Sequence, residues 1–174
     1  DSASVRAEAS DSLGRPLDLQ SLGQLYFRTL MYPSAAAAEG RVGGAMVFGA
    51  NFSIGVNLFY RIAQYAAELF AQFPEYEAFI EEQHHSRKKD APSGTALKIK
   101  EVISRYVNTG EIAATRAGNI PGTHRVGFDG PADQILLEHT ARTRDGFALG
   151  AIMAAEWIVG KQGFFEFGDV LNKK

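Results

Sequence analysis

One run of residues, 82–96, constrains this chain more than any other part of it. It reads EQHHSRKKDAPSGTA, so two imidazoles, a basic cluster and a helix-start signal lie within fifteen positions. The preceding segment, 76–83, mixes aromatic, apolar and acidic residues as a strand does. A Pro-Ser pair is typical of a helix entry, and apolar residues then recur at helical spacing. We therefore predict a strand, a basic loop and a helix over about 94–106.

The residue types in this run favour an anion site that also handles a proton. Ser93, Gly94 and Thr95 would present unpaired amides and two hydroxyls at the positive end of a helix dipole, which suits a carboxylate or a phosphate. A histidine at 84 or 85 changes charge near neutral pH, and Lys88 supplies a positive charge and a proton. Together these residues predict binding of an acidic small molecule with general acid catalysis.

Each part of the run also has a simpler interpretation. A Ser-Gly-Thr sequence at a helix start is usually only a cap, and the charged segment 87–90 is typical of a solvated turn. Adjacent histidines on a strand point to opposite faces, so His84 and His85 need not both face a ligand. It is the combination of these features that favours a site.

Composition limits the classes of function. With 18 basic and 20 acidic residues among 174, the net charge of -2 gives no general attraction to nucleic acid or to an anionic membrane. No cysteine is present, which excludes a disulfide framework and thiolate chemistry. We expect no metal site, because none of the four histidines has an evident i,i+4 partner on a helix. With neither a membrane span nor a signal peptide in the sequence, we expect a cytoplasmic protein.

The remaining periodicities predict an α+β fold. A helix over 57–73 precedes the run at 82–96, and strands over 111–116, 124–128 and 134–139 follow it. The first of these helices carries one apolar stripe, formed by Leu58, Ile62, Tyr65, Leu69 and Phe73.

The C-terminal part predicts one more helix and an aromatic tail. Asp145 is a suitable cap for the helix, and the tail at 163–167 is too apolar to be left in water. We expect the tail to pack on its own core or on a neighbour. The inward face of the helix is predicted to hold Phe147, Ala151, Ala154, Ala155 and Ile158.

Three blocks of the sequence resemble one known family. The run at 82–96 fills every fixed position of E-x-H-H-x-x-K-x-D-A-P-S-G-T-A, which resembles the signature of dihydrodipicolinate reductase, also called 4-hydroxy-tetrahydrodipicolinate reductase. The segment at 50–57, ANFSIGVN, is similar to the family's passage from its cofactor domain into its substrate domain. The third block comprises residues 116–124, 139–144 and 147–151, in the family's order.

This resemblance implies a fold and a reaction. The fold is a mixed β-sheet with helices packed on one face, in a substrate-binding and oligomerisation domain that commonly assembles as a homotetramer through sheet edges. The reaction belongs to the diaminopimelate route of lysine biosynthesis. A hydride passes from NADH or NADPH to an unsaturated cyclic imine with two carboxylates, and the neighbouring ring carbon gains a proton.

The resemblance also assigns roles to residues. It makes Lys88 the proton donor and His84 its acid/base partner, and it leaves Lys89 off the H-H-x-x-K spacing. It places Asn51 and Phe52 near the nicotinamide, although a phenylalanine read alone is more often part of a core. The residues that it implies for holding the substrate carboxylates are His85, Ser93, Gly94, Thr95 and Arg144, with Arg142 as the alternative arginine.

The N-terminus departs from the family pattern, in which a dinucleotide-binding domain comes first. We expect residues 1–45 to be an arm or a remnant of that domain, and residues 46–174 to be the substrate-binding and oligomerisation domain. The glycine cluster at 40–44 reads as a loop before a strand and not as a cofactor fingerprint. Two other functions stay open: a catalytically silent dicarboxylate-binding or assembly module, and an unrelated acid/base enzyme acting on a carboxylate.

Overall fold

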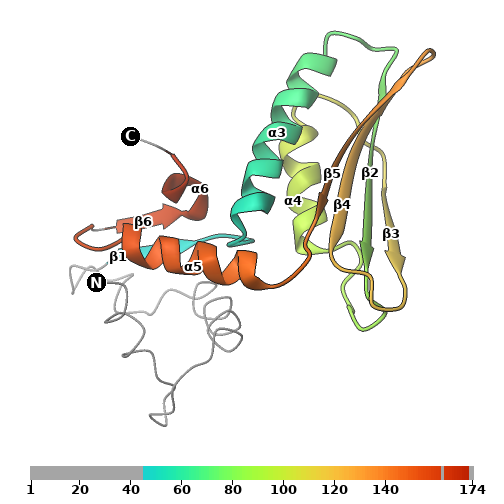
Figure 1. Cartoon of the computed structure of the whole chain (residues 1–174). Coiled ribbons are helices and arrows are strands. Elements are labelled where there is room, and N and C mark those ends of the chain that lie inside the picture. The colour runs from blue at the N-terminus through green and yellow to red at the C-terminus, as the bar shows by residue number, and fades with distance from the viewer. Residues whose placement is uncertain (1–44, 162, 173–174) are drawn as a thin grey trace. The chain divides into compact units, whose positions relative to one another are not determined.

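The computed structural model describes residues 45–161 and 163–172 (Figure 1). Within these residues the chain forms two compact units, one spanning 50–146 and the other built from 45–49 and 147–172. The predicted arm and the glycine cluster at 40–44 lie outside the described residues, and the predicted boundary at residue 45 stays a prediction. No helix in the described part of the chain combines the length and the apolar character that crossing a membrane requires.

The larger unit is built on a four-stranded sheet with the order β3-β2-β4-β5. The strands are β2 (Glu77–His84), β3 (Ile112–Arg116), β4 (Thr123–Asp129) and β5 (Gln134–Thr140). β2 runs parallel to β3, whereas the β2–β4 and β4–β5 pairs are antiparallel, so the sheet is mixed. All four strands were predicted, with ends within two residues of those observed.

Two helices cover one face of this sheet, as Figure 1 shows: α3 (Ile54–Phe70) and α4 (Gly94–Ile103). α4 is the crossover between the parallel strands β2 and β3, and α3 packs beside α4. A parallel pair needs such a crossover because its strands enter the sheet from the same end. The predicted α+β fold, with a mixed sheet and helices on one face, is confirmed.

The apolar stripe predicted for the first helix faces outward. Ser53 caps α3 by accepting a hydrogen bond from the Val56 amide at 3.3 Å, so the helix begins three residues before the predicted start. Small residues on the buried face, Ala63 and Ala67, let the helix backbone approach its neighbours closely. The full buried set is Val56, Phe59, Tyr60, Ala63 and Ala67, and the exposed set is the predicted stripe of Leu58, Ile62, Tyr65, Leu69 and Phe73.

The core lies between the helices and the inner face of the sheet. Alternation along each strand turns Ile80 of β2 and Val126 and Phe128 of β4 toward the helices, and all three are at most 1% exposed. The Phe128 ring stacks on Phe70 at 4.2 Å between centroids. Burial of each such side chain contributes about 1.5–3 kcal/mol, so these contacts are the main source of the unit's stability.

The smaller unit contains a two-stranded parallel sheet, β1 (Ala45–Phe48) with β6 (Gly163–Glu166), and the short helix α6 (Phe167–Val170). The strand predicted after the glycine cluster is therefore present as β1. Phe165 contacts Trp157 edge to face at 5.0 Å, and Phe167 is fully buried. Part of the aromatic tail thus packs within the chain, as predicted, while Phe164 is exposed.

The helix α5 (Asp145–Trp157) begins at Asp145. Asp145 is therefore the first helical residue and not the cap, and its carboxylate accepts a hydrogen bond from the Thr143 hydroxyl at 2.9 Å. Of the predicted inward face, Ala151 and Ala154 are buried, while Phe147, Ala155 and Ile158 are partly buried.

Candidate functional site

The candidate site begins where β2 ends. His84 is the last residue of that strand, and its carbonyl accepts a hydrogen bond from the Ala117 amide at 3.0 Å. Ser86 donates its amide to the Gly118 carbonyl at 3.2 Å, which ties the loop after β2 to the loop after β3. Gly122 leaves room for the His84 ring, since a Cβ there would lie 2.9 Å from its Cε1 atom. The loop backbone is thus held on both sides of the imidazole.

The anion cradle predicted at residues 93–95 coincides with the start of α4, where the protein itself uses part of the polar groups. The Ser93 amide donates to Glu82 Oε1 at 3.0 Å, and its hydroxyl accepts from the Ala96 amide at 3.1 Å. Ser93 is only 2% exposed, so the protein itself uses its polar groups. Gly94 is exposed, and a Cβ there would meet nothing within 4 Å. The backbone amides of Gly94 and Thr95, at the start of the helix, are the groups of the predicted cradle that could meet an anion.

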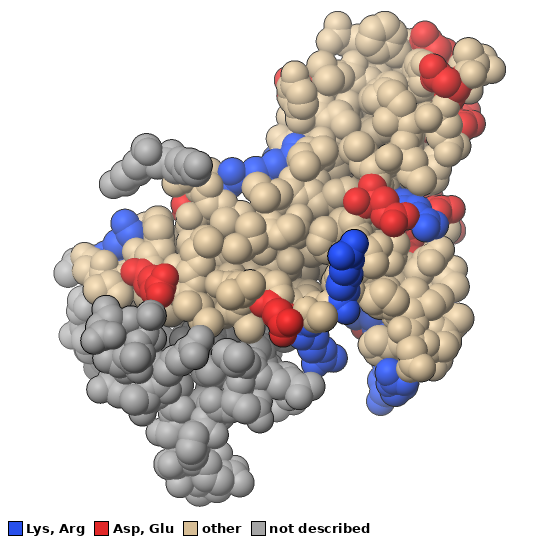
Figure 2. All heavy atoms as spheres, viewed as in Figure 1, with Lys and Arg blue, Asp and Glu red and all other residues tan. Residues whose placement is uncertain are grey.

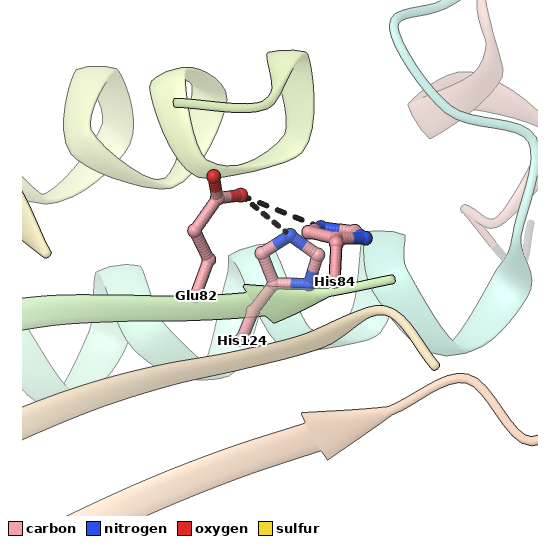
Figure 3. A group of neighbouring side chains, drawn as sticks. All are labelled: Glu82, His84 and His124. Atoms are coloured by element: carbon pink, nitrogen blue, oxygen red, sulfur yellow. Dashed lines mark ion pairs between the residues drawn. The ribbon is translucent and has the colours of Figure 1, made fainter. Parts of the chain in front are cut away.

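Behind this cradle lies a buried carboxylate, Glu82. It is 1% exposed, and its Oε1 atom accepts hydrogen bonds from the Ser93 amide and from Arg116 Nη2 at 2.5 Å. Figure 3 shows the other oxygen facing two imidazoles: Oε2 lies 3.4 Å from Nε2 of His84 and 3.6 Å from Nε2 of His124. Glu82 and His124 are direct partners in the β2–β4 register, which accounts for this meeting.

The charges at this cluster follow from burial and from hydrogen bonding. Burial alone would raise the pKa of Glu82, but hydrogen bonds from Ser93 and Arg116 outweigh it and lower the pKa. Burial lowers the pKa of His84 although the charge of Glu82 opposes the shift, and Lys88 and Arg116 add to the lowering. Burial also lowers the pKa of His124 to about 4, and the neighbouring His84 adds to this shift. At neutral pH the cluster therefore contains a charged carboxylate and two neutral imidazoles.

Lys88 lies in the basic loop, where it is held by Asp90. Its Nζ atom donates to both carboxylate oxygens, at 2.8 Å and 2.9 Å. The hydrogen bond from Lys88 lowers the pKa of Asp90. The Asp90 carbonyl in turn accepts a hydrogen bond from Arg116 Nη2 at 2.6 Å. Arg116 therefore joins the loop that carries Lys88 to the buried Glu82.

The structure brings one predicted cofactor residue to the predicted cradle. Asn51 donates its side-chain amide to Thr95 Oγ1 at 3.1 Å and accepts from the Ser53 amide at 2.8 Å. Asn51 and Phe52 are each 7% exposed. Arg144 is exposed in the segment before α5, and no contact joins it to the cradle in the described structure. His85 follows the end of β2 and is partly buried.

A metal ion is the other occupant that this geometry would suit. One donor atom each from Glu82, His84 and His124 lies within 4.8 Å of the others. The surrounding charge opposes a divalent cation, because Arg116 is already bonded to the same carboxylate and Lys88 acts electrostatically on both imidazoles. The expectation of no metal site stays a prediction.

Sequence reasoning gave no role to Glu82, Arg116 or His124, which the structure places at the centre of the cluster. The signal for Glu82 was available, since alternation along a strand puts residues 82 and 84 on one face. The positions of Arg116 and His124 depend on strand order and register, which one sequence does not reveal.

Comparison with known sequences identifies close relatives of this chain. The family model described as "Dihydrodipicolinate reductase, C-terminus" matches residues 55–171. A 4-hydroxy-tetrahydrodipicolinate reductase of Christiangramia forsetii is 39% identical over 141 residues, covering 74% of this chain and 59% of the relative. One from Archaeoglobus fulgidus is 38% identical over 149 residues, covering 73% and 57%. The chain thus spans somewhat more than half the length of these curated relatives.

A solved structure has the same fold. It is a dipicolinate-bound dihydrodipicolinate reductase from Paenisporosarcina sp. TG-14, with a TM-score of 0.57 and 22% identity, over 87% of this chain and 60% of that one. The family model covers more than half of the chain, and it includes the strand–loop–helix segment that carries the cradle. From the sequence match and the fold together, the chain belongs to the dihydrodipicolinate reductase family, in the part that corresponds to its C-terminal domain.

Proposed function

We propose that the site at the start of α4 binds a cyclic dicarboxylate, and that the protein serves as a 4-hydroxy-tetrahydrodipicolinate reductase in lysine biosynthesis. The observation that supports this most is the helix start at Gly94, which is exposed, and Thr95, which is partly buried, beside the loop that carries Lys88. A helix N-terminus binds carboxylates because its amides and its dipole both favour negative charge. The solved relative is a dipicolinate-bound enzyme, and dipicolinate is a planar ring with two carboxylates.

In the proposed mechanism, the amides of Gly94 and Thr95 hold one carboxylate of the substrate. Lys88, released from Asp90, gives a proton to the ring carbon beside the one that is reduced. His84 is the acid/base partner of Lys88, and His85 and Arg144 supply further contacts to the carboxylates. Ser93 contributes indirectly, since its own groups hold Glu82 and the helix cap.

NADH or NADPH is the proposed cofactor, and it supplies the hydride when bound. Asn51 is the residue that fits a role at the nicotinamide best, because its amide bonds Thr95 of the cradle. Phe52 lies beside it in the sequence and is buried. The described residues contain no strand, glycine-rich turn and helix in succession that would hold a pyrophosphate.

The proposed assembly is a homotetramer formed through the sheet of the larger unit. The edge strands are β3 and β5, and β5 exposes Ile135 and Leu136 at 44% and 47%. An uncovered sheet edge with apolar side chains favours pairing with another copy. We propose a cytoplasmic setting, without nucleic acid or membrane partners. On the face in Figure 2, basic and acidic side chains are interspersed and large areas carry neither.

The second candidate is a catalytically silent dicarboxylate-binding or assembly module. The observation that favours it is that the family match, over residues 55–171, is to the C-terminal domain of the reductase. Such a module would keep the cradle and the sheet edges while leaving the hydride chemistry to another protein.

Calorimetric titration separates these candidates. The chain is titrated with NADH and NADPH, and then with pyridine-2,6-dicarboxylate in each mixture. Nucleotide binding followed by tighter analogue binding supports the reductase, whereas analogue binding alone supports the silent module. Lys88→Met should weaken analogue binding, and Lys98→Met on the exposed side of α4 is the matched control. Wild-type protein that binds neither ligand at millimolar concentration would contradict both the reductase and the dicarboxylate-binding module.

A further inference from the structure

The most unusual side chain in the described structure is Glu82, a carboxylate whose side chain is 0% exposed. A buried carboxylate is costly unless hydrogen bonds and opposite charges compensate it. Only one of its oxygens is compensated in this way: Oε1 accepts from Ser93 and Arg116, whereas Oε2 has no hydrogen bond. Oε2 therefore needs a hydrogen-bond donor to compensate for its burial.

Two imidazole nitrogens are available to Oε2, and their surroundings differ. Nε2 of His124 already has a partner, since it lies 3.2 Å from the Ser93 hydroxyl. Nε2 of His84 is buried, has no hydrogen bond and lies 3.4 Å from Oε2. A movement of a few tenths of an ångström would bring these two atoms to hydrogen-bond distance. His84 is thus the natural donor to Glu82.

The protonation of the neutral imidazole then follows from electrostatics. If Nδ1 carried the proton, the lone pair on Nε2 would face the lone pairs of a charged carboxylate, which is repulsive. With the proton on Nε2, the ring donates to Oε2, and Nδ1 is left as the basic nitrogen. The groups that face the ring from neighbouring elements are Arg116 of β3, His124 of β4 and Lys88 of the loop, and none of them is an acid that competes with Glu82.

We propose that Glu82 is a positioning residue that fixes His84 as the Nε2–H tautomer and, through its other oxygen, holds the Ser93–Thr95 cradle beside it. One carboxylate thereby sets both the proton-accepting nitrogen of the site and the position of the anion-binding helix start. The assignment of Nδ1 as the base rests on the proposed function, in which His84 takes part in acid/base chemistry. The tautomer itself follows from the geometry alone.

The test is nitrogen-15 NMR of the histidine rings in the full 174-residue chain, with the His84 signals assigned by a His84→Asn variant. In the wild type, the proton is expected on Nε2. In Glu82→Gln, an amide NH₂ faces the ring and donates to Nε2, so the proton should move to Nδ1. Glu81→Gln is the matched control, because Glu81 is the next residue of β2, faces the opposite side of the sheet and pairs with Arg125. It should leave the His84 tautomer unchanged.

Two results would overturn the proposal. One is a wild-type His84 protonated on Nδ1, and this measurement decides the matter even where Glu82→Gln does not fold. The other is a folded Glu82→Gln protein, verified by circular dichroism, in which His84 keeps its proton on Nε2.

Binding of pyridine-2,6-dicarboxylate gives a second and separate measure. Glu82→Gln should bind the analogue roughly tenfold more weakly than the wild type, because the Ser93 amide loses a charged acceptor and the cradle is held less firmly. An unchanged affinity would contradict the link between Glu82 and the cradle. Failure of the wild type to bind would contradict the proposed function and leave the tautomer test in force.

Discussion

The inner face of the four-stranded sheet has two ends that differ in polarity. At one end, Ile80 of β2 faces Val126 of β4 in a dry apolar core. One alternation step further, Glu82 faces His124 in an equally buried but polar cluster. The same two strands, with one continuous register, build both ends.

The two ends contribute differently: the apolar end stabilises the fold, and the polar end orients the side chains of the candidate site. At the apolar end, packing lowers the free energy of the folded state, and no side chain there has to be oriented by a hydrogen bond. At the polar end, burial is unfavourable and is offset by specific partners, of which Arg116 and Ser93 are the main ones for Glu82. Such a cluster adds little net stability, and its value is the fixed geometry that it gives to His84 and the cradle.

The largest expected effect lies at the apolar end. Phe128→Ala should lower the free energy of unfolding by about 4 kcal/mol, because a fully buried ring stacked on Phe70 leaves a cavity. Phe73→Ala is the matched control at a residue that is 51% exposed, and it should cost less than about 1 kcal/mol. Urea denaturation measures both values. Similar losses in the two variants would mean that the core has been wrongly located.

The next effect compares two arginines on opposite faces of the sheet. Arg116→Ala removes the partner of a fully buried carboxylate and should cost about 3 kcal/mol. Arg125→Ala removes ion pairs with Glu81 and Glu138 on the solvent side of the sheet and should cost much less than Arg116→Ala, with an effect that falls further with added salt. Denaturation at low and high salt tests both. An Arg116 variant as stable as the Arg125 variant would show that Glu82 needs no compensation.

The third effect is a pH dependence of stability. His124 has its pKa lowered by burial from 6.5 to about 4, so the unfolded chain binds more protons than the folded chain between these values. Stability is therefore unaffected above pH 6.5 and should fall by about 2–3 kcal/mol as the pH drops to 4. His84 and His139, whose pKa values burial also lowers, act in the same direction.

Urea denaturation between pH 7.5 and 4 provides the measurement, and His124→Gln is the informative variant. The variant should lose the largest part of this slope, because a glutamine does not titrate. The Glu82 carboxylate becomes protonated only below its usual pKa of 4.5, so its contribution is lost at lower pH. If stability depends on pH equally in the variant and the wild type, the His124 imidazole of the wild type must be solvated and charged, which would contradict its described burial.

The smallest expected effect on stability is at Gly122, where a substitution would instead move the ring of His84. A Cβ at this position would lie 2.9 Å from Cε1 of His84, so Gly122→Ala should displace the ring while changing stability by less than about 1 kcal/mol. Gly94→Ala is the control, since its Cβ meets nothing within 4 Å. Ring NMR signals of His84 should move in the first variant only, and movement in neither would contradict the described packing.

Much of this fold was predictable because its signals are local. Strand alternation, the Pro-Ser helix entry and the turn residues gave four strands and the α4 helix within a few residues of their observed ends. The face of α3 was not predictable in the same way, because apolar residues surround that helix. Small residues at 63 and 67 decided which side packs, and that choice depends on the neighbouring elements.

The candidate site likewise has one part that could be predicted from the sequence and one part that could not. Lys88 and the cradle at 93–95 could be read from one continuous run, because their chemistry is local to a loop and a helix start. The buried cluster could not be read in full, since Arg116 and His124 reach Glu82 only through the pairing of β2 with β3 and β4. The hydrogen bond from the Ser93 amide to the Glu82 carboxylate could not be predicted from the sequence either.

The most direct test of the account is NMR mapping of pyridine-2,6-dicarboxylate on the chain, followed through backbone amides and histidine rings. We predict saturable shifts at the amides of Gly94 and Thr95 and at the ring of His84, with the apolar end around Ile80 and Val126 undisturbed. Saturable shifts confined to other parts of the chain, or no shifts at millimolar analogue, would contradict the assignment of the polar end of the sheet as a dicarboxylate site.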